Sequence, residues 1–286
     1  MPAPFRVRFM PALLALLFVA GCSRAAEVVD VRAPSTSPLP PVFVAVKGDW
    51  GYGSSEQTAI TQRMCDVRKQ RPFADVITTG DNFYRPDGEA TERNFGAPEA
   101  CLIAAPEHMW RPSWGNHDFG RKATAETLGA KDHYYSWRTG KATFIALDSN
   151  MLDDASQTAF LEKALSASSD RIKIVYFHHP AFTGGPHVGS EEVRTRWVPL
   201  FERYGVDLVL NGHNHSYEHS VVNSIHYVVT GGGGAVTYPC LRQEPYLIKC
   251  EPEHHFLVLR LEVGRAEVTA LRVDGSVLDS FWVSET

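Results

Sequence analysis

Five short clusters rich in Asp, Asn and His recur along the chain, each at the end of an apolar run or a predicted strand. A single Gly-Asp is usually a turn and a single His usually an ordinary side chain, but five such clusters in order indicate one shared site. In α/β proteins such sites form beyond the carboxyl ends of strands, so the sequence predicts a metal-binding site there. The clusters are Gly48-Asp49-Trp50-Gly51, Gly80-Asp81-Asn82-Phe83-Tyr84, Gly115-Asn116-His117-Asp118, Val175-Tyr176-Phe177-His178 and Gly212-His213-Asn214-His215.

The apolar runs predict an α/β domain. Short β-rich runs bounded by polar residues or Gly are typical of buried strands, and they occur at 42–46, 75–79, 172–177 and 206–210. Apolar residues with helical spacing occur at 56–71, 155–166 and 191–204. Closely spaced runs joined by turns predict antiparallel meander strands at 224–230, 255–263, 266–273 and 277–283. Without an internal repeat or second linker, residues 42–286 are predicted to be one domain.

The N-terminal residues are predicted to direct export. An apolar run at 10–20 follows two arginines and is too short to span a bilayer, which is typical of a signal peptide. The run ends Val19-Ala20-Gly21-Cys22, which resembles the lipobox of bacterial lipoproteins, where the Cys is lipidated and becomes the new N-terminus. Ordinary cleavage after Ala25 or Ala26 is the alternative.

We therefore expect residues 1–21 to be a lipoprotein signal peptide. The stretch 22–41 is rich in Pro, Ser and Ala, a composition that favours an extended tether over a packed element. Together these features predict an exported protein of the periplasm or cell envelope, held at a membrane by a lipid anchor at Cys22.

Four further cysteines form an even set in a chain that is predicted to be exported, which favours disulfides. Three pairings are possible, and joining Cys65 to Cys101 and Cys240 to Cys250 closes the shortest loops. Cys65 and Arg71 also have the Cys-x5-Arg spacing of cysteine-dependent phosphatases. The residues between them contain no Gly to curl around a phosphate, so a thiol mechanism is disfavoured.

The formal net charge of −5 disfavours a nucleic-acid partner. It is compatible with a small phosphorylated substrate, because bound cations can provide the local positive charge. The sequence contains neither a Gly-x-Ser-x-Gly elbow nor a Walker-type phosphate loop. The absence of these motifs fits a metal-assisted reaction, which needs no protein nucleophile.

In this order the five clusters resemble the metallophosphoesterases, or calcineurin-like phosphoesterases, over nearly all of the predicted domain. The stretch from Gly80 to Tyr84 reads Gly-Asp-x-x-Tyr and is similar to the purple acid phosphatases, in which the phenolate binds a ferric ion and gives the colour. The resemblance implies a four-layer αββα sandwich with mixed sheets and with the metals at the carboxyl ends of the strands.

The resemblance also implies ligands for two metal ions, Fe(III) and a divalent Fe, Zn or Mn, with Asp81 bridging them. Hard oxygen donors suit Fe(III), and a site richer in imidazole suits a divalent ion. The implied ligands of the first ion are Asp49, Asp81, Tyr84 and His215. Those of the second are Asp81, Asn116, His178 and His213.

The implied activity is that of an acid phosphatase, in which a metal-bound hydroxide attacks the phosphorus of a phosphomonoester directly. By resemblance, His117 protonates the departing oxygen, Asp118 orients His117, and the loop residue His187 is a second active-site histidine. Asn116, His117 and His187 would contact the substrate. A solvated surface position is the alternative for His187. A phosphodiesterase on the same fold and a noncatalytic metal- or phosphate-binding lipoprotein are the alternative functions.

Three further features carry expectations. Because adjacent strand residues point to opposite faces, His179 is expected to be a structural or supporting residue rather than a ligand. Four glycines at 231–234 are expected to form a loop at the edge of the site. His219 stands where many relatives have Arg, which leaves substrate contacts there in doubt, and His254 and His255 are expected to be ordinary.

Overall fold

A computed structural model describes residues 40–105, 107–130 and 132–284 of the chain. The predicted signal peptide at 1–21, the lipidation site Cys22 and the tether as far as residue 39 lie outside these ranges. Within the described ranges, no helix has both the length and the apolar character that crossing a membrane requires.

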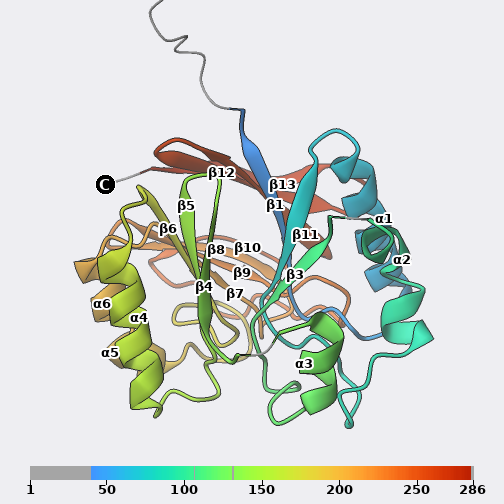
Figure 1. Cartoon of the computed structure of the whole chain (residues 1–286), viewed down its shortest axis with the longest axis horizontal. Coiled ribbons are helices and arrows are strands. Elements are labelled where there is room, and N and C mark those ends of the chain that lie inside the picture. The colour runs from blue at the N-terminus through green and yellow to red at the C-terminus, as the bar shows by residue number, and fades with distance from the viewer. Residues whose placement is uncertain (1–39, 106, 131, 285–286) are drawn as a thin grey trace, which may run out of the picture. The chain divides into compact units, whose positions relative to one another are not determined.

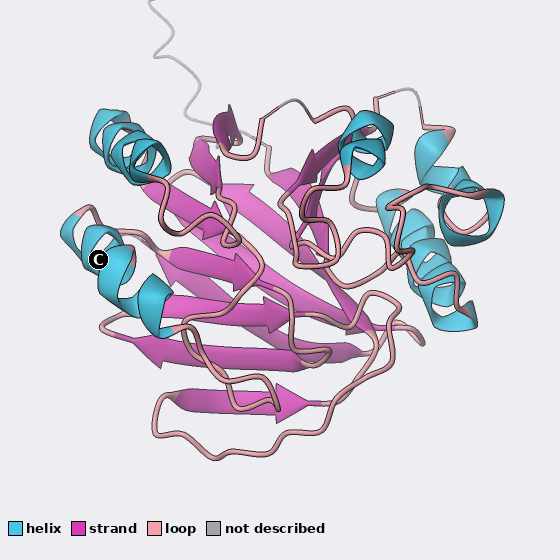
Figure 2. Cartoon of the chain, turned by 90° about the horizontal axis from the view of Figure 1, so that it is seen from below, coloured by secondary structure: helices cyan, strands magenta, loops and turns pink. Residues whose placement is uncertain are grey.

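Two stacked mixed sheets form the centre of the domain (Figures 1 and 2). The first sheet has the order β13-β12-β11-β1-β2-β3. Its strands are β1 (Val42–Lys47), β2 (Phe73–Thr78), β3 (Met109–Pro112), β11 (His255–Glu262), β12 (Arg265–Arg272) and β13 (Val277–Ser284). The second sheet has the order β10-β8-β9-β7-β6-β5-β4. Its strands are β4 (Tyr135–Thr139), β5 (Ala142–Ala146), β6 (Ile172–Tyr176), β7 (Leu208–Asn211), β8 (Tyr217–Val222), β9 (Ile225–Thr230) and β10 (Leu247–Glu251).

Helices cover the outer faces of both sheets. Figure 1 shows α1 and α2 on one side of the sheets and α4, α5 and α6 on the other. The helices are α1 (Ser55–Arg68), α2 (Ala100–Ile103), α3 (Lys122–Leu128), α4 (Ala155–Ala167), α5 (Glu191–Arg196) and α6 (Val198–Arg203), with a short π-helix, η1, at Glu92–Gly96. The layers therefore follow the order αββα, which confirms the expected fold.

Alternation along β1 shows how the layers arise from the sequence. Val44 and Val46 belong to the apolar cluster between the two sheets, together with Phe144 of β5. Ala45, the residue between the valines, instead packs with Ile60 on α1. Successive side chains of a strand point to opposite faces, so an all-apolar run fits a strand that is buried on both sides.

Both sheets contain parallel strands that bring distant segments to one edge. In the first sheet β1 is parallel to β2 and β2 to β3, and in the second β5, β6 and β7 are parallel neighbours. Four of the five sequence clusters lie in the loops after β1, β2, β3 and β7, and the fifth runs from the end of β6 into the loop after it. The carboxyl edge of the two sheets is thus where the predicted site residues can meet.

Two predictions about secondary structure were wrong. The predicted helix at 191–204 is two helices, α5 and α6, which meet at Trp197, and α6 has a Pro in its first turn. Pro lacks the N–H that a continuing helix needs, so it favours the start of a new helix. The predicted meander strand at 224–230 is β9, which lies in the second sheet between β7 and β8. The other three, β11 to β13, do form an antiparallel meander.

The cysteines form the two disulfides that close the shortest loops. Cys65 on α1 is bonded to Cys101 on α2, and Cys240 is bonded to Cys250 on β10. The bond at Cys65 leaves no thiol for the Cys-x5-Arg alternative, which agrees with the sequence-based preference against it.

Candidate metal centre

Three of the predicted ligands adopt a backbone conformation that non-glycine residues rarely occupy. Asp49, Asp81 and His213 have φ values of 55°, 48° and 72°. Left-handed torsions cost energy in residues that carry a Cβ, and they persist where the surrounding structure enforces them. Here each one turns the chain sharply after its strand, β1, β2 or β7, and directs a side chain towards the centre of the edge.

An oxygen-rich half of the site contains Asp49, Asp81, Tyr84 and His215. The Tyr84 hydroxyl lies 3.0 Å from Nε2 of His215 and 3.4 Å from Oδ1 of Asp49. Nε2 of His215 is 3.4 Å from the same Asp49 oxygen. One ligand atom each from Asp49, Asp81 and His215 lies within 4.8 Å of the others. The four residues predicted to hold the first ion therefore lie together.

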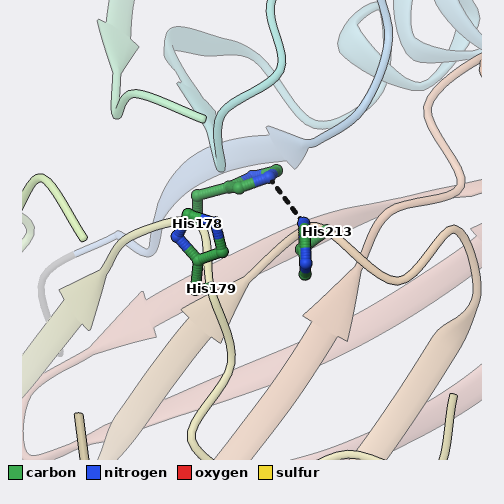
Figure 3. A group of neighbouring side chains, drawn as sticks. All are labelled: His178, His179 and His213. Atoms are coloured by element: carbon green, nitrogen blue, oxygen red, sulfur yellow. Dashed lines mark hydrogen bonds between the residues drawn. The ribbon is translucent and has the colours of Figure 1, made fainter. Parts of the chain in front are cut away.

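An imidazole-rich half contains Asn116, His178 and His213. Nε2 of His178 is 3.1 Å from Oδ1 of Asn116 and 3.2 Å from Nδ1 of His213. Figure 3 shows the second of these contacts, with the two rings arriving from different strand ends. The predicted ligands of the second ion are thus close enough to share one cation.

Asp81 belongs to both halves. Besides its place in the oxygen-rich half, its Oδ1 lies 3.5 Å from Nε2 of His178. The same Oδ1 accepts a hydrogen bond from the backbone N–H of His117 at 2.9 Å. A carboxylate in this position can contact two neighbouring ions, as expected of the bridging ligand.

The buried carboxylates carry an electrostatic cost in the absence of metal. Asp49 is fully buried and Asp81 is 2% exposed. The pKa of Asp49 is raised to about 7, mainly by burial and also by the charge of Asp81, against the opposing hydrogen bond and charge of His215. Burial also raises the pKa of Asp81, although the His117 N–H opposes this shift. A bound cation would favour both charged forms and remove the cost.

The imidazoles are held neutral, which is the form that binds metal. Burial lowers the pKa of His213 to about 2 and places that of His178 well below its usual range. His215 differs: burial lowers its pKa, but the hydrogen bond and charge of Asp49 outweigh this effect and leave it raised. Burial also raises the pKa of the Tyr84 phenol. Close carboxylate, phenol and neutral imidazole groups fit two cations.

His117 lies at the open side of the oxygen-rich half. Its side chain is 47% exposed, its ring centroid is 4.6 Å from that of Tyr84, and its Nε2 is 4.0 Å from Oδ2 of Asp81. A ring so placed can reach a substrate that approaches from solvent.

Asp118 has a different role from the one predicted. Its carboxylate accepts hydrogen bonds from the backbone N–H groups of Asn82 and Gly115 at 2.9 to 3.1 Å, and from the Asn82 side chain. The two loops that carry Asp81 and Asn116 are tied together in this way. Asp118 therefore positions the ligand loops. Its carboxylate contacts Asn82 and Gly115 rather than the ring of His117, which it was expected to orient.

His187 lies beside the imidazole-rich half, as a second active-site histidine would. Its ring centroid is 4.3 Å from that of His213. The loop is fixed because the side chain of Asn214 accepts from the His187 N–H at 3.0 Å and donates to its carbonyl at 2.9 Å. Glu218, which is buried, accepts from the N–H of Gly184 and anchors the start of this loop.

His179 lies beside the predicted ligands, which fits the expected supporting role but not the argument from strand alternation. Its ring centroid is 4.6 Å from that of His213 and 4.9 Å from that of His178, and Figure 3 shows the three rings together. Strand β6 ends at Tyr176, so the alternation of side chains along a strand no longer applies to His178 and His179. Nδ1 of His179 is 2.8 Å from the Ser149 hydroxyl, which orients its ring.

The glycine run 231–234 borders the site, as expected. The Gly233 N–H donates to the carbonyl of Gly48 at 2.9 Å, and a Cβ on Gly231 would overlap the backbone of Asn214. His254, through its ring, and His255, through its backbone N–H, both contact the carbonyl of Gly232 in this run. His219 is bonded to Asp279 and His226, so it takes no part in the ligand cluster.

Sequence reasoning missed Tyr238, whose ring stacks on His215 with a centroid distance of 4.0 Å and an interplanar angle of 11°. Its backbone N–H also donates to the His215 carbonyl at 2.8 Å. Tyr238 lies in no strand or helix and follows no motif, so no local signal marks it.

Ligand side chains gathered where the parallel strands of two stacked sheets end define a metallophosphoesterase. The comparison with protein families agrees with this class. Residues 44–217 match the family described as calcineurin-like phosphoesterase, and the chain belongs to that family. Every predicted ligand, from Asp49 to His215, lies inside the matched range.

Similar proteins include purple acid phosphatases. The chain is 25% identical to purple acid phosphatase 17 of Arabidopsis thaliana, over 85% of this chain and 84% of that protein. Its fold is similar to that of purple acid phosphatase PPD1 from yellow lupin, with a TM-score of 0.71 at 18% identity over 87% of this chain and 55% of the other. GAP50, described as the anchor in the inner membrane complex of Plasmodium, has a TM-score of 0.76 at 16% identity, over 87% and 90% of the two chains.

Proposed function

We propose that this phosphoesterase is an acid phosphatase that hydrolyses phosphomonoesters with two metal ions, Fe(III) in the oxygen-rich half and a divalent Fe, Zn or Mn in the imidazole-rich half. One observation carries the proposal. A phenol oxygen, that of Tyr84, lies in contact distance of Asp49 and His215 inside the ligand cluster. Phenolate and carboxylate oxygens are hard donors that suit Fe(III).

When bound, the two ions supply Lewis acidity and an activated water for in-line displacement at phosphorus. The side chains position the two halves of the site and supply the proton that the leaving group needs. Asp81 spaces the two halves, and Asp118 fixes the backbone on which Asp81 and Asn116 stand. In this proposal His117, whose side chain is 47% exposed, protonates the oxygen of the departing alcohol, and His187, beside His213, binds the phosphate together with Asn116.

The test is metal analysis of the purified protein combined with hydrolysis of phenyl phosphate and diphenyl phosphate. We expect two metal ions per chain, including iron, and preference for the monoester. Preference for the diester would replace the proposal with a phosphodiesterase. Two bound metals without hydrolysis of either compound would support a noncatalytic metal-binding role, an alternative that the similarity to an anchor protein also raises.

We further propose that the protein is exported and anchored to a membrane by lipid on Cys22. The support is the small-residue run before this Cys and the Pro-rich stretch after it. Cys22→Ala should release the protein from membranes with its activity unchanged, as measured by fractionation and phosphatase assay, because the change lies before the catalytic domain. A processed variant that stays with the membrane would contradict lipidation.

A further inference from the structure

Several large apolar side chains are exposed around the ligand cluster. Tyr52, Val188, Val236 and Leu241 are 52%, 74%, 66% and 61% exposed. With Tyr238, which is half-buried, we call these five residues the apolar rim. Isolated exposed apolar residues are common on proteins, but a group of them beside a polar centre indicates a binding surface.

Two aromatic rings of the apolar rim pack directly on predicted ligands. The Tyr52 ring meets the Tyr84 ring edge-on, with centroids 5.4 Å apart. The Tyr238 ring stacks on that of His215. The rim is therefore continuous with the oxygen-rich half of the site.

Backbone contacts place the other three rim residues. The Val236 carbonyl accepts a hydrogen bond from Nδ1 of His215 at 2.7 Å. Val188 directly follows His187. The Leu241 N–H donates to the carbonyl of Gly184 at 2.9 Å, so it runs beside the His187 loop. The Cys240–Cys250 disulfide ties this segment to β10.

Two cations, one beside Tyr84 and one in the segment that carries Leu241, already have partners. Arg85, the residue after Tyr84, pairs with Asp87 at 2.6 Å. The Arg242 guanidinium donates to the carbonyls of Gly185 and His187. Their engagement favours an apolar rather than a polyanionic group at this side of the site.

We propose that the apolar rim binds the leaving group of the substrate, and that the enzyme prefers phosphate monoesters of apolar alcohols or phenols. The inference rests on the proposed function, since it names the substrate class of the same site. Apolar surface of the leaving group leaves water on contact with the rim, which favours binding in proportion to the area buried. The phosphate meanwhile lies at the ligand cluster.

The test compares substrates that differ in apolar size but not in leaving-group chemistry. Propyl phosphate and hexyl phosphate form an alkyl pair, and phenyl phosphate and naphthyl phosphate form an aryl pair. With the metal-loaded protein we expect kcat/KM to be about tenfold higher for the larger member of at least one pair, mainly through a lower KM. The pair that responds identifies alkyl or aryl groups as the better fit.

Variants then assign the preference to the rim. Leu241→Ser and Val188→Ser should each reduce the size preference roughly threefold or more. Val263→Ser, an exposed valine in the turn between β11 and β12, is the matched control and should leave the preference unchanged. Equal kcat/KM within both pairs, or a size preference that both variants retain, would refute leaving-group binding by the apolar rim. The proposed phosphatase activity would still stand. Failure to hydrolyse any of the four monoesters would overturn the proposed function and this inference together.

Discussion

The two halves of the metal centre share Asp81 but differ in chemistry. The oxygen-rich half gathers a carboxylate and a phenol around one histidine, whose pKa is raised by contact with Asp49. The imidazole-rich half gathers neutral histidines whose pKa values are lowered by burial. Each half also has one histidine beside it, His117 against Tyr84 and His187 against His213. The two halves thus differ in the type of donor they offer, which is the basis for the proposed assignment of a trivalent ion to one half and a divalent ion to the other.

Loss of the shared residue should give the largest effect. We expect Asp81→Ala to lose both metals and to lower kcat by about 10³-fold or more, because no carboxylate then spaces the two ions. Metal content and turnover measure this. Asp66→Ala, an exposed Asp on α1 paired with Lys69, is the control. Two tightly bound metals in the Asp81 variant would refute the bridge between the halves.

Substitution of His117 and of His187 should differ in how the loss of activity depends on the leaving group. His117→Ala should retain both metals and lower kcat by about 10²- to 10⁴-fold, most for alkyl phosphates, whose alkoxide needs a proton. His187→Ala should lower kcat/KM roughly 10- to 100-fold for alkyl and aryl phosphates alike, since it would lose a contact with phosphate. If both variants showed the same leaving-group dependence, the assignment of His117 as the acid would be wrong.

Tyr84→Phe tests by colour whether the oxygen-rich half binds Fe(III). A phenolate on Fe(III) gives a visible charge-transfer band, and we expect the variant to lose it while activity falls roughly tenfold, less than in Asp81→Ala. Absorption spectra of iron-loaded proteins measure this. Tyr52→Phe is a matched control, because its ring touches Tyr84 from the side. A colourless iron-loaded wild type would remove Tyr84 from the ligands.

The smallest effect is the opposite pH dependence of the halves in metal-free protein. Below about pH 6.5 the unfolded chain protonates His213 but the folded chain does not, so this residue lowers stability as pH falls. Between about pH 4 and 7 the folded chain keeps the Asp49 proton that the unfolded chain loses, so Asp49 lowers stability as pH rises. In thermal melts, His213→Asn should lose less stability as pH falls below about 6.5, and Asp49→Asn should lose less stability as pH rises from about 4 to 7. Unchanged slopes would contradict the assigned pKa shifts.

The sequence by itself predicted the residues that cluster at the candidate metal centre, and its resemblance to a known family implied the four layers. Asp49, Asp81 and His178 could be found because each follows a recognisable apolar strand, and parallel strands deliver their carboxyl ends to one edge. Helices α1 and α4 followed from their apolar spacing, whereas α2 and α3 were not predicted and the expected helix at 191–204 is split in two. The disulfide pairs were left open at that stage, since loop length alone does not fix which cysteines meet.

Only the tertiary structure decided what lies next to the ligands. His179 joins the cluster because the chain bends after Tyr176, and the Asp118 carboxylate is taken by backbone N–H groups of a neighbouring loop. Tyr238 reaches His215 from a segment without regular structure. In each case loop torsions and contacts between distant segments set the direction of the side chain, and neither is encoded in the spacing of nearby residues.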